Sequence, residues 1–254
     1  MSASVAFDTI EIVLSDGTAE AYLAHPDDGA AHPGVLLYMD AYGVRPWLGE
    51  IVKTIAAQGF TVIAPNVFYR TWSLADAPEV DFDKSHTAFF TALGPAREQL
   101  TPEAAMRDAG GYLAWLDASP LVAPAPYATL GYCMGGRLAL RVATEFGDRI
   151  AAAASFHGGR LAADDLPDSP HHQADGISAE VLAAHADNDS SMDAEAIERF
   201  EKALTEAGVT FTSVVYPDAQ HGFTMRDTPA YQEAGYHRHI EDLLALLRRN
   251  FPSA

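Results

Sequence analysis

The sequence predicts an α/β domain built on a mainly parallel sheet of about eight strands, with helices on both faces. Short apolar runs, typical of strands that are covered on both sides, alternate with stretches of helical periodicity from residue 34 onward. Before residue 34, polar and apolar residues alternate on either side of a turn, which predicts a hairpin at the start of the domain. The sequence contains no internal repeat, low-complexity tract or interdomain linker. We therefore expect residues 1–254 to form a single domain.

The first quarter of the chain predicts a hairpin, a strand, a helix and a second strand. Thr9–Leu14 and Glu20–His25 alternate in polarity on either side of a Ser-Asp-Gly turn. Continuous apolar runs predict buried strands at Gly34–Met39 and Phe60–Pro65. Between them Pro46–Gln58 is expected to be helical, because a proline lies in its first turn and a glycine follows its end.

Residues 66–101 lack a clean periodicity and carry aromatic, proline and acidic residues. A segment of this length in a compact domain is usually functional or disordered, and the aromatic residues favour a function. We interpret it as an excursion over one face of the sheet, with room for a short helix, that borders a substrate pocket. A helix is then predicted over Thr101–Asp117.

The second half continues the alternation of strands and helices. Strands are predicted at Tyr127–Leu130, Ala151–His157, Glu180–Ala186 and Thr210–Tyr216, and helices from Arg137 onward and over Asp193–Ala207 and Tyr231–Arg249. Gly158–Ser178 is acidic and contains glycine and proline, so it is predicted to be a loop.

Composition excludes several classes of function. The chain has 254 residues, 48% hydrophobic content and a formal net charge of −19. Such a charge argues against binding to nucleic acids or anionic membranes. One cysteine forbids an intrachain disulfide, and the N-terminal residues do not resemble a signal peptide. We expect a cytoplasmic protein with a small-molecule substrate; its oligomeric state stays open.

Residues 131–135, Gly-Tyr-Cys-Met-Gly, form a G-x-C-x-G pattern between a predicted strand and a predicted helix. This is the nucleophile-elbow pattern with sulfur in place of the serine oxygen. A turn this sharp strains its central residue, and flanking glycines avoid the collisions that side chains would cause. The Cys133 side chain would lie at a helix N-terminus, where free N–H groups favour a negative charge. The alternative is that Cys133 is a small buried hydrophobic residue, as lone cysteines often are.

Two further polar residues follow predicted strands, and we expect them to join Cys133 at one edge of the sheet. His221 would remove the proton from the thiol and return it to the leaving group, because imidazole titrates near neutrality. Asp189 would fix the tautomer of the histidine and stabilise the imidazolium. Cys133, Asp189 and His221 follow one another in the chain as nucleophile, acid and base, which is an order found in known hydrolytic triads. Asp187 and Asp193 are alternatives for the acid. The loops that carry Asp189 and His221 could also be solvent-exposed loops without a catalytic role.

The histidines do not predict a metal site. His237 and His239 lie two residues apart on a predicted helix and would face different sides. His171 and His172 lie in an acidic loop and are expected to be solvated. We therefore expect neither a metal nor a cofactor.

Four stretches give the sequence a resemblance to the dienelactone hydrolase family, whose members have the α/β-hydrolase fold. They span most of the chain in the family's order, and the Gly-Tyr-Cys-x-Gly-Gly stretch is rather specific. The stretches are Asp40-Ala-Tyr-Gly-Val, Gly131-Tyr-Cys-Met-Gly-Gly, Ala186-Asp-Asn-Asp-Ser-Ser-Met and Tyr216-Pro-Asp-Ala-Gln-His-Gly-Phe. The resemblance implies a cysteine-nucleophile enzyme that opens lactone or ester bonds.

Carried over to this sequence, the family pattern assigns a role to each of the matching residues. Cys133 would be the nucleophile, Asp189 the acid and His221 the base. The backbone N–H groups of Ala41 and Met134 would form the oxyanion hole.

The departures from the family pattern concern the residues around this triad. The family usually has glutamate where Asp40 stands, so Asp40 would either serve the thiol, as a catalytic residue, or only stabilise its loop. Substrate binding is expected at Tyr42, Arg70, Phe223 and Arg226, although neither arginine aligns cleanly with the arginines that hold a substrate carboxylate in the family.

We expect a hydrolase that opens a lactone or small ester through a cysteine acyl-enzyme. A general carboxylesterase or thioesterase is the alternative within the enzymes. A non-catalytic member of the fold that binds a small ligand is the alternative from another class. Loss of ester hydrolysis in Cys133→Ala would separate an enzyme from a binder.

Overall fold

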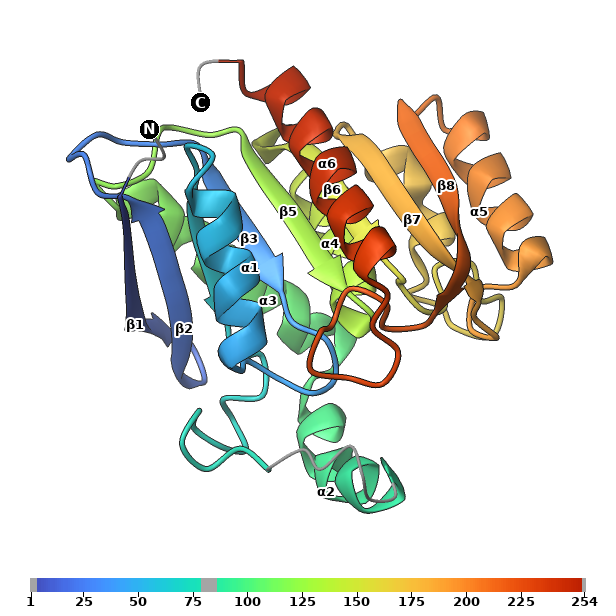
Figure 1. Cartoon of the computed structure of the whole chain (residues 1–254), viewed down its shortest axis with the longest axis horizontal. Helices are drawn as coiled ribbons and strands as arrows, with labels where there is room; N and C mark the ends of the chain where they lie inside the picture. Colours follow the sequence, from blue (N-terminus) through green and yellow to red (C-terminus); the bar gives the residue numbers. More distant parts are fainter. Residues whose placement is uncertain (1–3, 79–85, 253–254) are drawn as a thin grey trace.

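Eight strands form one sheet in the order β1-β2-β4-β3-β5-β6-β7-β8 in the computed structural model, which describes residues 4–78 and 86–252 (Figure 1). The strands are β1 (Val5–Leu14), β2 (Gly17–Pro26), β3 (Gly34–Tyr38), β4 (Thr61–Pro65), β5 (Tyr127–Tyr132), β6 (Ile150–Phe156), β7 (Glu180–Asn188) and β8 (Phe211–Gln220). β1 and β2 pair antiparallel, and so do β2 and β4, whereas every pair from β4 to β8 is parallel. The predicted α/β class and mainly parallel sheet are confirmed.

Helices cover both faces of this sheet. They are α1 (Pro46–Ala56), α2 (His86–Gln99), α3 (Pro102–Ala118), α4 (Met134–Phe146), α5 (Ala194–Glu206) and α6 (Glu233–Asn250), with short 3-10 helices η1 (Gly147–Arg149) and η2 (Pro170–Gly176). In Figure 1, α1 and α6 lie in front of the sheet, α3 and α4 lie behind it, and α2 lies apart, below the carboxyl ends of the central strands. This edge of the sheet is where a parallel α/β fold places its ligands.

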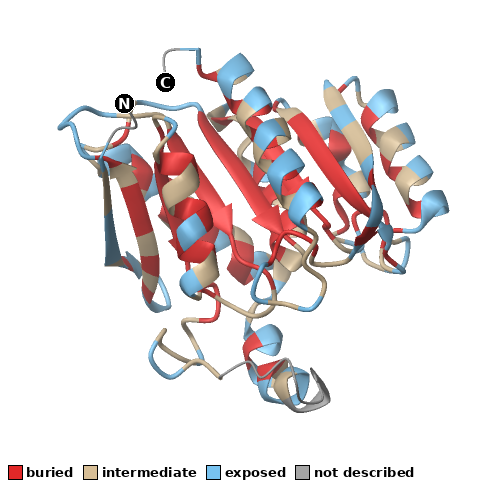
Figure 2. Ribbon diagram, in the orientation of Figure 1, coloured by how far each residue is buried: buried red, intermediate tan, exposed pale blue. Residues whose placement is uncertain are grey.

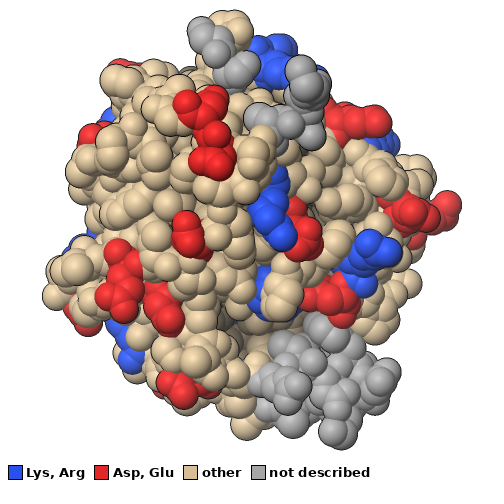
Figure 3. Space-filling view, turned by 60° about the vertical axis from the view of Figure 1, so that its left-hand side comes forward, with Lys and Arg blue, Asp and Glu red and all other residues tan. Residues whose placement is uncertain are grey.

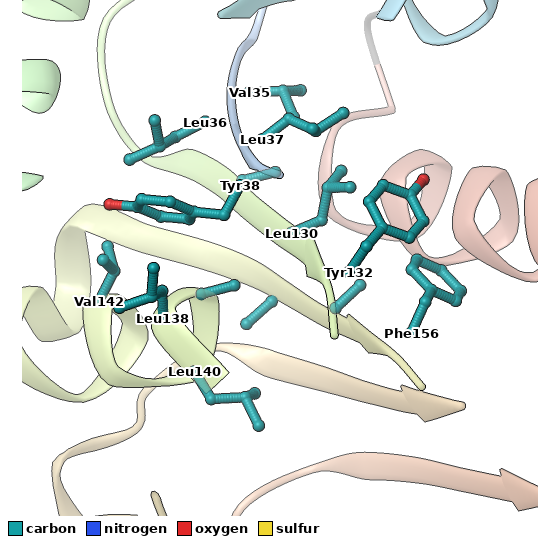
Figure 4. Packing of buried hydrophobic residues seen from close by; sticks show 14 of the residues in the cluster. Val35, Leu36, Leu37, Tyr38, Leu130, Tyr132, Leu138, Leu140, Val142 and Phe156 are labelled. Carbon is teal, nitrogen blue, oxygen red and sulfur yellow. The ribbon is translucent and has the colours of Figure 1, made fainter. Parts of the chain in front are cut away.

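The central strands form the core because both of their faces are covered. Every residue of β3, β4 and β5 is buried (Figure 2). Figure 4 shows Leu138 and Val142 of α4 on one side of the sheet and Tyr132 and Phe156 together on the other. Burial of one such large apolar side chain contributes about 1.5–3 kcal/mol. The core therefore holds β5, and with it the turn that follows, in a fixed position.

The elements differ from the sequence prediction mainly at their ends. The hairpin strands are longer than predicted, because pairing between backbones does not require the side chains to alternate in polarity. β8 likewise continues to Gln220, four residues beyond the predicted end at Tyr216. The predicted loop Gly158–Ser178 contains η2.

The excursion predicted at residues 66–101 contains turns at its beginning and α2 at its end. α2 is longer than the short helix allowed for, although Pro95 lies inside it. The part of the excursion at residues 79–85 lies outside the described residues. α2 borders a cavity at Cys133 along much of its length, with Phe90, Gly94, Arg97 and Glu98.

The surface is consistent with the charge argument. On the face in Figure 3, basic side chains are dispersed in small groups and lie close to acidic ones. No helix among the described residues combines the length and the apolar character needed to cross a bilayer.

Candidate active site

Cys133 lies in the turn between β5 and α4, as the elbow pattern predicts. Its backbone has φ 54° and ψ −119°, a conformation that residues other than glycine rarely adopt. A Cβ on Gly131 would collide with the backbone of Gly135, and a Cβ on Gly135 would collide with the carbonyl oxygen of Met39. Both glycines of the motif are therefore required by close backbone contact. The strained turn places the Cys133 side chain at the N-terminus of α4.

Asp189 and His221 meet at the carboxyl ends of β7 and β8. His221 Nδ1 lies 2.6 Å from Asp189 Oδ2, and the Asp189 side chain is only 3% exposed. The other carboxylate oxygen accepts hydrogen bonds from the Ser191 N–H at 2.9 Å and from the Ser191 hydroxyl at 2.6 Å. Burial raises the pKa of Asp189, but the His221 contact and the Ser191 hydrogen bonds outweigh burial and lower it. Asp189 is thus held as an anion against the imidazole.

The two alternative acids are engaged elsewhere. Asp187 accepts a hydrogen bond from the backbone N–H of Asp218 at 3.1 Å. Asp193 caps the N-terminus of α5 by accepting from the Ala196 N–H at 2.9 Å. Both positions have local structural roles.

The pKa of His221 reflects the groups on either side of its ring. Burial lowers this pKa, but hydrogen bonds with Asp189 and Cys133, and the negative charges of both groups, raise it to about 10. The raised pKa gives His221 a high affinity for a proton, which is a property that a general base needs.

Cys133 and His221 line the same cavity, which has a volume of about 400 Å³. Its remaining wall is largely apolar. It is lined by Asp40, Ala41, Tyr42, Phe90, Cys133, His157, Gln220, His221, Gly222, Met225, Thr228, Pro229 and Ala230. A small ester of mostly apolar character would fit such a space.

The two backbone donors expected for an oxyanion are close to the thiol. Met134 is the first residue of α4, so its N–H has no partner within the helix. Ala41 follows β3 and lines both cavities that contain Cys133. These N–H groups are the candidates for stabilising a negatively charged oxygen.

Asp40 borders the Cys133 cavity, but its carboxylate is engaged by Arg45. Arg45 donates from Nη1 at 2.7 Å and from Nη2 at 3.0 Å, and the Tyr42 N–H donates at 2.9 Å. Arg45 also binds Asp227, in the segment that follows His221 in the chain, at 2.6 Å. Burial lowers the pKa of Arg45, but the two carboxylates raise it by more. Of the two roles considered for Asp40, these contacts favour stabilisation of the Ala41 loop.

The four residues expected to bind substrate lie at different places. Tyr42 lines the cavity with Cys133. Phe223 is fully buried and packs on Tyr216 and His157, beneath the surface of the site. Neither arginine is among the described residues that line the two Cys133 cavities: Arg70 is paired with two aspartates, and Arg226 stacks on Trp47.

His157 is a site residue that the sequence analysis did not identify. It is 1% exposed, and its ring packs edge-on against His221 with centroids 5.3 Å apart. Its Nε2 lies 2.8 Å from the Thr224 hydroxyl. Burial lowers the pKa of His157 well below its usual value, and the charge of His221 lowers it further. A signal existed, because His157 directly follows β6 at the edge where the site lies.

One group of side chains outside these cavities could supply metal ligands. Asp164, His171 and His172 each present a ligand atom within 4.8 Å of the others. Arg199 lies 3.6 Å from Asp164, however, and its charge opposes a cation there. These residues do not line the cavities that contain Cys133.

Comparisons with known proteins identify the family to which the chain belongs. The sequence pattern that defines the Dienelactone hydrolase family matches residues 19–251. A Salmonella typhi protein provisionally named carboxymethylenebutenolidase is 28% identical over 230 residues, which is 87% of this chain and 80% of the relative. A Yersinia pestis protein with the same provisional name is 29% identical over 220 residues, 83% of this chain and 76% of the relative.

The fold is also found among solved structures. The crystal structure of a protein from Klebsiella pneumoniae, provisionally described as a dienelactone hydrolase, superposes with a TM-score of 0.84 at 21% identity. The superposition covers 99% of this chain and 100% of that one. With the family pattern matched across nearly the whole chain, this protein belongs to the dienelactone hydrolase family.

Proposed function

We propose that this protein hydrolyses small carboxylic esters or lactones through a cysteine acyl-enzyme. Membership of the family supports a lactone or ester hydrolase. The observation that supports the cysteine mechanism is the arrangement of one cavity. Cys133, on its strained turn, lines that cavity together with His221, whose ring Asp189 holds at 2.6 Å.

The first step forms the acyl-enzyme. His221 takes the thiol proton, and the Cys133 sulfur attacks the carbonyl carbon to give a tetrahedral intermediate. The N–H groups of Ala41 and Met134 stabilise its oxyanion, and one such donor is worth about 2.7–4 kcal/mol. The intermediate collapses to a thioester as His221 gives its proton to the departing alkoxide.

The second step releases the acid. His221 removes a proton from a water molecule, which attacks the thioester carbonyl and restores the Cys133 thiol. Asp189 stabilises the imidazolium in both steps. Esters and lactones fit this chemistry better than amides. Attack by the thiolate gives a tetrahedral intermediate, and an alkoxide leaves that intermediate more readily than an amine anion does.

Hydrolysis of p-nitrophenyl acetate tests the proposal. Cys133→Ala should abolish turnover above the uncatalysed rate. Asp189→Asn should lower kcat by about 10²–10⁴-fold with the fold intact, because the imidazole loses its orienting anion. Asp187→Asn is the matched control and should retain turnover. Full activity in Cys133→Ala would exclude the cysteine mechanism.

The alternative of a general carboxylesterase or thioesterase differs only in substrate preference. A panel that compares cis-dienelactone with simple esters and thioesters of similar size distinguishes the two. A higher kcat/KM for the lactone would support the lactonase assignment.

A further inference from the structure

His157 is a buried histidine that takes no part in the steps proposed above. It follows β6 directly, is 1% exposed, and lines the cavity that contains Cys133 and His221. Its φ of 39° lies in the left-handed region, which residues other than glycine seldom adopt. Such a conformation persists only where the surrounding structure imposes it, and it is often found at active sites. A role for His157 should therefore be visible in its contacts.

The ring of His157 packs against the ring of His221. The two ring centroids lie 5.3 Å apart, with the ring planes at 65°. The same ring packs against Phe223, the second residue after His221, with centroids also 5.3 Å apart. Burial lowers the pKa of His157 well below its usual value, so the ring is neutral and adds no charge beside the imidazole of His221. His157 is therefore suited to holding His221 in place rather than to exchanging protons with it.

A hydrogen bond joins His157 to the segment that carries His221. Nε2 of His157 lies 2.8 Å from the hydroxyl oxygen of Thr224, and both residues are buried. With the hydroxyl as donor, only the Nδ1 hydrogen of His157 lacks a partner in the described part of the chain. With the donor reversed, the hydroxyl hydrogen would lack a partner as well. We therefore assign the Thr224 hydroxyl as the donor and Nε2 as the acceptor.

Thr224 is also held from a second side. Its carbonyl oxygen accepts a hydrogen bond of 3.0 Å from Nε1 of Trp47, at the start of α1. Thr224 is fully buried and is not among the described residues that line the two Cys133 cavities. It comes three residues after His221 in the chain. Fixing Thr224 from β6 and from α1 thus limits where the segment that carries His221 can lie.

Asp189 alone does not fix the His221 ring. It holds Nδ1 at 2.6 Å, but a bond at one atom leaves the ring free to pivot about that atom. The His221 side chain is 34% exposed, so solvent borders part of it without restraining it. His157 packs against the ring, and its bond to Thr224 holds the segment that follows. This restraint matters because a misplacement of about 1 Å at a catalytic group can cost about 100-fold in rate.

We propose that His157 and Thr224 are positioning residues that hold His221 where it can exchange a proton with Cys133. His157 acts in two ways, through its ring contact with His221 and through its bond to Thr224. Thr224 acts only through this bond and through the backbone that it shares with His221. This assignment rests on the proposed function, because it takes His221 as the base.

Ester turnover by variants of Thr224 tests the proposal. Thr224→Val removes the hydroxyl and keeps the shape of the side chain. For p-nitrophenyl acetate, kcat and kcat/KM should fall together, about 10- to 100-fold, with KM little changed, because a displaced base impairs the proton transfers and not substrate binding. Thr224→Ser keeps the hydroxyl and should retain most of the wild-type kcat, although it loses a buried methyl group. Wild-type kcat in Thr224→Val would overturn the proposal.

Thr61→Val is the matched control for the loss of a buried hydroxyl. Thr61 is also fully buried and donates to the Leu121 carbonyl oxygen at 2.7 Å. It is the first residue of β4, at the edge of the sheet opposite the candidate site. Thr61→Val should lower the melting temperature about as much as Thr224→Val does and leave kcat unchanged. An equal loss of kcat in the two variants would indicate a general effect of lost stability and overturn the proposal.

His157→Phe tests whether His157 and Thr224 act as one unit. Phenylalanine keeps a ring and removes Nε2. Each single variant leaves one buried polar group unpaired, whereas the double variant with Thr224→Val removes both partners, so its melting temperature should partly recover. Its kcat should stay as low as in the single variants, because the bond is absent from all three. Losses of kcat that multiply, or a kcat that recovers with the melting temperature, would contradict the shared role.

Crystal structures of the wild type and of Thr224→Val separate this proposal from the proposed function, because they require no turnover. In the wild type we expect Nδ1 of His221 at 2.6 Å from Oδ2 of Asp189. In Thr224→Val the His221 ring should be displaced by about 1 Å or occupy more than one rotamer. That result supports the proposal even if the wild type hydrolyses no ester. A His221 ring that does not move overturns it, even if the wild type is an active esterase.

Discussion

At Asp40 a carboxylate lies at the edge of the active-site cavity, yet its side chain is only 5% exposed and bound by a guanidinium. Arg45 joins this carboxylate to Asp227, so it links the segment after β3 to the segment after β8. The first segment carries Ala41 and the second follows His221. A single arginine therefore holds together two segments at this edge of the sheet.

Substitutions of Asp40 or Arg45 should lower the free energy of unfolding more than they lower ester turnover. Arg45→Met leaves the buried Asp40 carboxylate without its partner and should cost about 3–5 kcal/mol of unfolding free energy. Asp40→Asn keeps a hydrogen-bond acceptor and should cost about 1–3 kcal/mol with ester turnover retained. Urea denaturation and kcat for the two variants measure this. Loss of turnover in a fully stable Asp40→Asn would instead assign Asp40 to the thiol.

His221 should make the stability of the protein depend on pH. In the folded protein, burial lowers the pKa of His221, but Asp189 and Cys133 raise it by more, from 6.5 to about 10. The stabilising contribution is therefore complete below pH 6.5 and is lost as pH rises through about 10. Because the side chain is 34% exposed, solvent screening reduces the change to about 1–2 kcal/mol.

The comparison with His221→Gln isolates this contribution. Wild type should exceed the variant in unfolding free energy by a margin that shrinks between about pH 6.5 and pH 10. Denaturation midpoints across that range measure the margin. A margin that stays constant with pH would show that folding does not raise the pKa of His221.

At the scale of elements, the turn from β5 to α4 is fixed by contacts between backbones. Gly135 lies against the carbonyl groups of Tyr38 and Met39, at the end of β3, so the helix can begin only if that position lacks a side chain. This contact places the α4 N-terminus beside Ala41. The elbow and the two proposed oxyanion donors are thus one packed unit.

Gly135→Ala should break this unit. The added methyl group has no room, and displacement of α4 should cost about 1–3 kcal/mol and reduce ester turnover. Gly110→Ala in α3 is the matched control, since its Cβ would meet only Phe146 at 3.6 Å, an ordinary contact. That change should stabilise the protein by about 0.4–1 kcal/mol. Equal melting temperatures for the two variants would contradict the packing argument.

The elements and the order of the site residues were predictable because their signals are local. The glycines around Cys133 and the positions of Asp189 and His221 after apolar runs are readable in short windows of sequence. Asp227, one of the two partners of Arg45, lies 182 residues away in the sequence. Charge pairing across a fold has no local signal. Arg70 illustrates this, since its position in the sequence gave no indication of its pairing with Asp108.

For the whole molecule, the sheet brings together residues from distant parts of the chain. Parallel neighbours β3, β5, β6, β7 and β8 deliver Ala41, Cys133, His157, Asp189 and His221 to one edge. The buried strands hold these ends rigidly, and α2 lies below the same edge (Figure 1). The arrangement of the candidate site is a consequence of the parallel order of the strands.

The whole account depends on a covalent bond at Cys133. Wild-type protein is mixed with p-nitrophenyl acetate, quenched in acid within the first turnover and digested, and the peptides are weighed by mass spectrometry. We expect one acetyl group, confined to the peptide that contains Cys133, which disappears when quenching is delayed and does not form in Cys133→Ala. Steady turnover with no acyl group on Cys133, or with the acyl group on another residue, would contradict the mechanism.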